Sequence, residues 1–131
     1  MTIARTTGTF EDILVGARPA LRPICEMLRR TIVSLHKRCI EVTWPRQKTA
    51  SFGIGPRKMT DHYAYIAVHS SHVNLGFYHG VTLTDRTRIL GGTGRRLRHV
   101  KVRDVSAAQN TAIRALLREA IADRRRHTKG G

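Results

Sequence analysis

Hydrophobic and polar positions in the first third of the chain repeat with the period of an α-helix. Thr9, with Asp12 three residues later, is typical of a helix N-cap, and Gly16 is expected to end a short helix. A longer helix is predicted to begin near Pro19, with Pro23 tolerated in its first turn. Its apolar residues recur at helical spacing and predict one buried face: Leu21, Ile24, Cys25, Leu28, Ile32 and Leu35.

The pattern then changes to a period of two, which predicts β-strands. Strands are expected at residues 40–44, where Pro45 ends the alternation, and at residues 50–54. Residues 63–69 and 72–78 are predicted to form a hairpin. One face of this hairpin is apolar and expected to be buried: Ala64, Ile66, Val68, Val73, Leu75 and Phe77. The other face is expected to be open to solvent: Tyr63, Tyr65, His69, His72, Asn74 and Tyr78.

The last third of the chain combines glycines and arginines with a second helical pattern. A short helix is predicted at residues 84–90, a flexible turn at residues 91–94 and a last strand at residues 98–103. Ser106 and Gln109 have the spacing of a capping box, so a final helix is expected to follow. Its apolar stripe is Ala112, Ile113, Leu116, Leu117, Ala120 and Ile121.

This order of helices, antiparallel sheet and final helix predicts an α+β fold with the helices packed on one face of the sheet. The chain of 131 residues has the size of one domain and contains no dividing linker, so a single domain over residues 1–131 is expected. Residues 1–8 and 124–131 have no apolar anchor and are expected to fray.

The chain has no features of a membrane or secreted protein. No run approaches the roughly 20 apolar residues that a membrane span requires, and the first residues lack the apolar core of a secretory signal. Cys25 and Cys39 are too far apart for a CxxC motif and are expected to be reduced thiols in or beside the core. These features predict a cytoplasmic protein.

A large positive charge changes this picture from a generic domain to a candidate binding protein. The chain has 24 Lys and Arg against 9 Asp and Glu, a formal net charge of +15. Such a charge attracts nucleic acid, phosphorylated metabolites or acidic surfaces, although an arginine-rich surface can also serve solubility alone. The expected partner is an anionic ligand or nucleic acid rather than a membrane, and homo-oligomerisation is left open.

One segment resembles a known family. Val73-Asn74-Leu75-Gly76-Phe77, followed by Gly80 and by the stretch from Leu90 to Val100, is similar to the YdhG-like family of small bacterial domains. Arg86 and Arg95 depart from that pattern, where Pro and Lys are usual. The resemblance covers nearly the whole chain and implies a YdhG-like fold. The family is largely of unknown function, and one branch is labelled a frataxin-like iron chaperone, so the resemblance implies intracellular metal or iron binding as an alternative function.

The residues themselves give metal binding little support. The nine acidic residues are scattered, and the close pair Glu119 and Asp123 is flanked by arginines that would repel a cation. His69 and His72 flank the predicted hairpin turn and would need a third ligand such as His62. We therefore predict neither a metal site nor a cofactor.

Known catalytic motifs are also absent from the sequence. The chain has no GxSxG elbow, no HExxH motif and no pair of carboxylates suited to acid–base chemistry. Cys25, on an apolar helix stripe, is a poor nucleophile because burial raises the pKa of a thiol. We therefore favour a non-enzymatic protein, with an enzyme that uses an unrecognised site on the Tyr/His face as a third alternative.

The most suggestive feature is the basic segment 86–103, which contains no acidic residue. Glycines let backbone N–H groups approach an anion, and neighbouring arginines can form bidentate hydrogen bonds to phosphate. The candidate anion-binding residues are Gly92, Gly94, Arg95, Arg96, Arg98 and Lys101.

A second candidate is an aromatic stacking surface on the polar hairpin face, of the kind that single-stranded nucleic-acid binders use. Its residues are Tyr65, His69, His72, Asn74 and Tyr78. The function that we favour is a small, basic, non-enzymatic module that binds a phosphate-bearing or nucleic-acid ligand.

Overall fold

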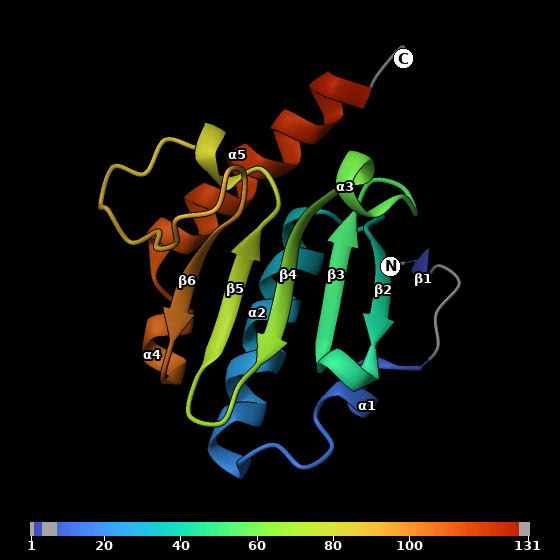
Figure 1. Ribbon diagram of the computed structural model, residues 1–131, viewed down its shortest axis with the longest axis vertical. Coiled ribbons are helices and arrows are strands. Elements are labelled where there is room, and N and C mark those ends of the chain that lie inside the picture. The colour runs from blue at the N-terminus through green and yellow to red at the C-terminus, as the bar shows by residue number, and fades with distance from the viewer. Residues whose placement is uncertain (1, 4–7, 129–131) are drawn as a thin grey trace.

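A single six-stranded sheet in the order β1-β2-β3-β4-β5-β6 organises the computed structural model, which describes residues 2–3 and 8–128 (Figure 1). Strands β2 to β6 run antiparallel to their neighbours, whereas β1 pairs with β2 in parallel. The strands are β1 (Thr2–Ile3), β2 (Ile40–Trp44), β3 (Thr49–Gly53), β4 (His62–Val68), β5 (Val73–Phe77) and β6 (Arg98–Val102).

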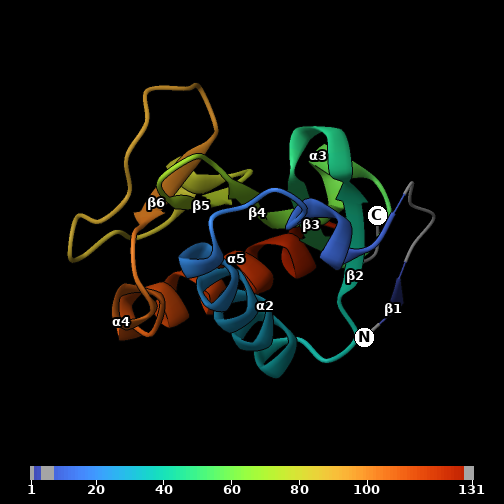
Figure 2. The same ribbon diagram turned by 90° about the horizontal axis from the view of Figure 1, so that it is seen from below.

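The helices α2, α4 and α5 cover one face of this sheet (Figure 2). The opposite face, which we call the open face, is turned toward the viewer in Figure 1. This arrangement of helices with an antiparallel sheet confirms the predicted α+β fold. The helices are α1 (Phe10–Ile13), α2 (Arg22–Leu35), α3 (Lys58–Asp61), α4 (Val105–Ala108) and α5 (Thr111–Thr128), with 3₁₀ turns at Pro19–Leu21, Pro45–Gln47 and Gly80–Thr82.

The first helix begins where the sequence predicts, whereas the second begins at Arg22, after a 3₁₀ turn at Pro19–Leu21. The Thr9 side chain accepts a hydrogen bond from the Asp12 backbone and Asp12 caps Thr9 in return, which is a complete capping box. Cys25 and Cys39 are buried and free, and burial raises the pKa of their thiols to about 12 and about 11. The apolar stripe of α2 is buried against the sheet at Ile24, Cys25, Leu28 and Ile32.

The hairpin β4–β5 has the predicted apolar phase. Ile66 lies opposite Leu75 and Ala64 opposite Phe77, and all four are buried on the helix-covered side. Tyr63 is not on the open face as expected. The register between β3 and β4 shifts at this point, and the Tyr63 side chain lies among core residues with its hydroxyl 2.8 Å from Nδ1 of His36.

Two predicted elements differ at the C-terminal side. Residues 84–90 form no helix: the Asp85 carboxylate caps the backbone N–H groups of Ile89 and Leu90, but Arg88 has a φ of 56°, which is incompatible with a right-handed helix. The predicted capping box at Ser106 is also wrong. Asp104 caps the single turn α4 by accepting from the Ala107 backbone, so α5 starts separately at Thr111.

The chain ends are more ordered than expected within the described residues. α5 continues to Thr128, and Arg124 is buried, with its guanidinium 2.9 Å from the Thr60 carbonyl. Thr2–Ile3 pairs with β2. The expectations for residues 1, 4–7 and 129–131 lie outside the described part of the chain. Among the described helices there is none whose length and apolar character would let it span a bilayer.

Candidate functional site

A cavity of about 320 Å³ lies on the open face of the sheet. Its walls come from the β2–β3 hairpin, from α3, from β4 and β5 and from the segment that leads into β6. The cavity-lining residues are Trp44, Gln47, Thr49, Lys58, Tyr65, Tyr78 and Leu97. None of them is acidic, and one carries a positive charge.

Two tyrosines form one side of this cavity. The rings of Tyr65 and Tyr78 are 5.2 Å apart between centroids and tilted by 55°, a geometry that favours aromatic contact. Tyr65 lies directly opposite Gly76 on β5, and a Cβ atom at Gly76 would overlap the Tyr65 ring. The missing side chain therefore allows the ring to lie across the sheet and reach Tyr78.

A buried hydrogen-bond network holds the Tyr78 side chain in place. Its hydroxyl is 2.9 Å from Oγ of Ser51, and Ser51 in turn bonds Nδ1 of His62. Burial lowers the pKa of His62 to about 4, with a smaller opposing effect of the Gly55 backbone, and it raises the pKa of Tyr78 to about 12. Both side chains are therefore neutral near pH 7. Tyr78 is buried, not solvent-exposed as expected, because its hydroxyl serves this network.

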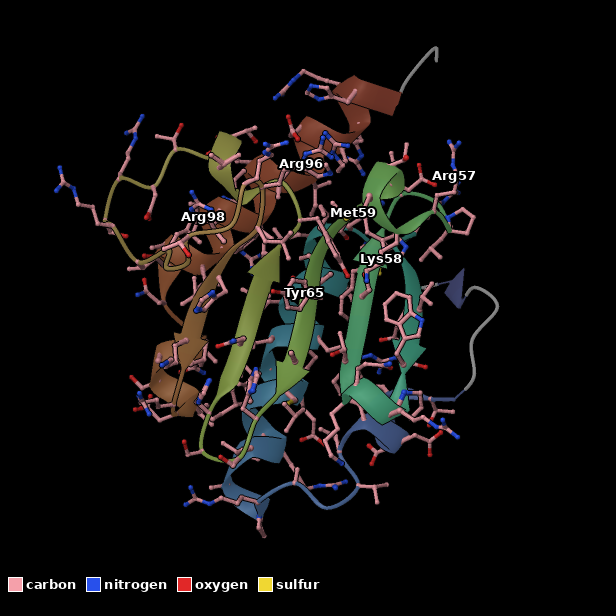
Figure 3. The ribbon with its side chains drawn as sticks, in the orientation of Figure 1. Arg57, Lys58, Met59, Tyr65, Arg96 and Arg98 are labelled. Atoms are coloured by element: carbon pink, nitrogen blue, oxygen red, sulfur yellow. The ribbon has the colours of Figure 1, made fainter. Side chains whose placement is uncertain are left out.

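Lys58 is the cationic residue that lines the cavity. Lys58 places its ammonium 5.2 Å from the centroid of the Trp44 ring, within the range of a cation–π contact. Figure 3 shows Lys58 and Met59 projecting over the open face beside Tyr65, with Arg96 and Arg98 on the side of the β5–β6 connection. Arg57, in the turn before α3, is largely exposed and forms an ion pair of 3.5 Å with Asp61.

The predicted anion-binding residues do not converge on one point. Gly92, with a φ of 113°, belongs with Gly94, Arg95 and Arg96 to an exposed connection before β6. That connection rises beside β6 on the side away from α2 and α5 (Figure 2). Of the whole segment 86–103, Leu97 lines the cavity.

The remaining two anion candidates lie elsewhere. Arg98 folds back and donates to the carbonyls of Gly94 and Leu97, which reduces its availability for a ligand. Lys101 is exposed on β6, opposite Asn74.

The sheet-face candidates separate into two groups. Tyr65 and Tyr78 line the cavity, whereas His69 and His72 stack on each other at the hairpin turn, 4.7 Å apart between centroids. Asn74 lies beside that turn, with Nδ2 3.2 Å from Nε2 of His69. Within residues 2–3 and 8–128, no three His, Cys, Asp or Glu side chains are grouped closely enough to hold a metal ion.

Sequence reasoning missed the side of the cavity formed by the β2–β3 hairpin and α3. Trp44 shares one face of β2 with Ile40 and Val42, and this apolar alternation would have placed it toward the core. The structure reverses that phase, because Glu41 faces the helices and pairs with Arg29 of α2. Lys58 follows Gly55-Pro56-Arg57, a basic turn whose position beside the sheet is set by tertiary packing. No local signal could have placed it over Trp44.

A larger groove of about 1120 Å³ lies along α2 on the helical side. Its lining includes the acids Glu11 and Glu26 together with Arg30, Lys37 and Arg114. Arg29, also in this lining, forms a 2.6 Å ion pair with Glu41. The mixed charge makes this groove a less suitable anion site than the open-face cavity.

Comparisons with known proteins identify no relative. No family model matches the chain, and neither the curated proteins nor the solved structures include a significant match.

Proposed function

We propose that this chain is a non-enzymatic module that binds a phosphate-bearing ligand in the open-face cavity. The observation that carries the proposal is the composition of the cavity: aromatic side chains, hydroxyl and amide groups, the ammonium of Lys58 and no carboxylate. Pockets of this kind combine apolar walls with a few polar groups that orient the ligand. An anion in the cavity would meet a cation without a competing negative charge.

The charge of the whole chain supports this proposal. A net charge of +15 raises the local concentration of anions around the molecule and speeds their association. Arg95 and Arg96 are exposed on the connection that reaches the cavity at Leu97, so their guanidinium groups are open to solvent. Arginine at such a position can form two parallel hydrogen bonds to a phosphate group.

The hydroxyl groups in the cavity favour binding over catalysis. Burial raises the pKa of both Tyr65 and Tyr78, so both phenols stay protonated near pH 7. A protonated phenol can donate a hydrogen bond to a phosphate oxygen but is a weak general base. The Tyr65 hydroxyl is therefore suited to orient a ligand, whereas the Tyr78 hydroxyl is already bonded to Ser51 in the buried network.

We also propose the family and the location that the sequence suggests. The YdhG-like assignment rests on the Leu75-Gly76-Phe77 motif. Its glycine has a structural role, because a side chain at Gly76 would overlap the Tyr65 ring. A cytoplasmic location is supported by two cysteines that are buried and unpaired. The iron-chaperone alternative finds no supporting ligand set among the described residues.

Isothermal titration calorimetry of Lys58→Ala with inorganic triphosphate tests the proposal. We expect the affinity to fall about 3- to 10-fold, because the variant removes the one cation that lines the cavity. Affinity of the wild type should also weaken between roughly 50 and 200 mM salt, because charged contacts are screened.

Arg30→Ala is the matched control, since it removes one exposed positive charge on the helical side. Equal losses in the two variants would reduce the binding to nonspecific attraction and contradict a site in the cavity.

A further inference from the structure

We propose that the natural ligand is a single-stranded nucleic acid and that one of its bases enters the open-face cavity. This inference rests on the proposed function and names the ligand class for the same site. The cavity of about 320 Å³ is small, which suits one nucleobase better than a larger group. It lies at the lower end of the range of about 300–1,000 Å³ that small-ligand pockets occupy.

The aromatic walls are the first argument for a base. Trp44 on β2 and Tyr65 on β4 contribute rings to the same cavity and neither is fully buried. Single-strand binding proteins use such side chains as stacking surfaces for successive bases, because every base has a π-face. A ligand that consists of phosphate alone would gain nothing from these rings.

Lys58 supplies the second argument, because it joins a cation to the aromatic wall. Its ammonium lies over the Trp44 ring at the cavity mouth. A base that enters beside Tyr65 would therefore leave its own phosphate near Lys58. This juxtaposition of ring and ammonium fits a nucleotide unit, which carries an aromatic group and an anion close together.

The distribution of charge favours a strand over a free nucleotide. Lys101 is exposed on β6 opposite Asn74, and Arg103 directly follows that strand. Burial lowers the pKa of His72, and the charges of His69, Lys101 and Arg103 lower it further. Arg95 and Arg96 are exposed on the connection between β5 and β6. These cations lie outside the cavity, so one nucleotide bound in the cavity would not contact them all. A polyanion that crosses the face would contact several of them.

The cavity also discriminates between single and double strands. Its base-sized space is bordered by side chains from α3 and from the β5–β6 connection. A base stacked in a duplex cannot enter such a space without leaving its helix, which costs pairing and stacking energy. An unpaired strand avoids this cost, so we expect single strands to bind more tightly than duplexes.

Trp44 provides the readout, because it is the only tryptophan of the chain and lines the cavity. We would titrate the protein with a mixed-sequence single-stranded oligonucleotide long enough to cross the face and follow Trp44 fluorescence and the anisotropy of a labelled strand. The comparison ligands are an abasic strand of equal length, a duplex of the same sequence and a nucleoside monophosphate.

The expected result is quenching of Trp44 by the base-containing strand, with binding roughly tenfold tighter than to the abasic strand. Tyr65→Ala should weaken binding of the base-containing strand several-fold more than binding of the abasic strand, because only the former loses a stacked base. Trp44→Ala, followed by anisotropy, is the second variant, and circular dichroism confirms that both variants fold. Arg114→Ala, an exposed charge on the helical side, is the control.

Three outcomes would overturn the inference. Equal affinity for base-containing and abasic strands, both weakened by Lys58→Ala, would leave a phosphate site that ignores bases. Equal affinity for the monophosphate and the strand would assign the cavity to a free nucleotide. Failure of every ligand to bind, with inorganic triphosphate also inactive, would remove the proposed function together with the inference.

Discussion

Tyr65 can lie across the open face because the residue opposite it on β5 is Gly76. The neighbours of Gly76 on the strand, Leu75 and Phe77, point the other way and are fully buried. Three consecutive residues therefore serve two functions. The outer two fill the core, and the middle one leaves room for the aromatic wall of the cavity.

Gly76→Ala is expected to destabilise the protein by about 1–3 kcal/mol, because the new methyl group overlaps the Tyr65 ring and forces it to move. Thermal or urea denaturation measures this loss. In a Tyr65→Ala background the same change should cost much less, since the overlapping ring is gone. Gly94→Ala is the control, because a Cβ atom there meets only ordinary contacts. Equal costs of Gly76→Ala in both backgrounds would show that the ring is not the obstacle.

The alternation of apolar and polar residues along β4 and β5 predicts which side of the hairpin is buried, but it does not predict the position of Tyr63. The apolar set that includes Ile66 and Leu75 follows a strict period of two, so one phase buries all of it. Tyr63 breaks the period because the β3–β4 register shifts between Phe52 and Gly53. No residue pattern near Tyr63 predicts that shift, because it depends on the pairing of β3 with β4 in the folded sheet.

Helix α5 is the element that departs most from expectation. Its last turns carry arginines without an apolar anchor, which is why fraying was predicted. The structure instead buries the Arg124 side chain, which bonds the Thr60 carbonyl at 2.9 Å and the Asp123 carboxylate at 3.2 Å. The stem and guanidinium of one arginine thus anchor the end of α5 to α3, through a tertiary contact that a sequence pattern does not show.

Arg124→Ala is expected to lower the free energy of unfolding by about 1–3 kcal/mol, because buried Asp123 loses a close partner and keeps only the exposed side chains Arg126 and His127. Urea denaturation measures the change, and circular dichroism should show some loss of helix at the end of α5. Arg125→Ala, one residue further and exposed, should change stability by less than about 0.5 kcal/mol. Similar small effects of both substitutions would mean that the end of α5 contributes little to the fold.

Elements close in sequence were predicted more successfully than the site that joins distant ones. The two hairpin strands and the helix Arg22–Leu35 have regular apolar spacing, so the sequence alone predicts these elements and their buried faces. The cavity instead joins Trp44 of β2, Lys58 of α3 and Leu97 of the connection before β6. Their proximity results from the sheet order and from the irregular path before β6, neither of which leaves a periodic signal.

The two faces of the sheet differ in their role in the whole molecule. The face covered by α2 and α5 holds the hydrophobic core, and the open face holds the acid-free cavity with its basic surroundings (Figures 1 and 3). The groove along α2, in contrast, combines both charges. A charge of +15 attracts anions to the entire molecule. A specific site is therefore distinguished from general attraction by where the anions bind.

Nuclear magnetic resonance can locate that site directly. We would titrate ¹⁵N-labelled protein with inorganic triphosphate and follow each amide signal together with the Trp44 indole N–H. The largest shifts are predicted at Trp44, Thr49, Lys58 and Leu97, because these residues surround the open-face cavity. The largest shifts along α2 near Arg30 and Ser34, or small shifts spread evenly over both faces, would contradict a specific anion site on the open face.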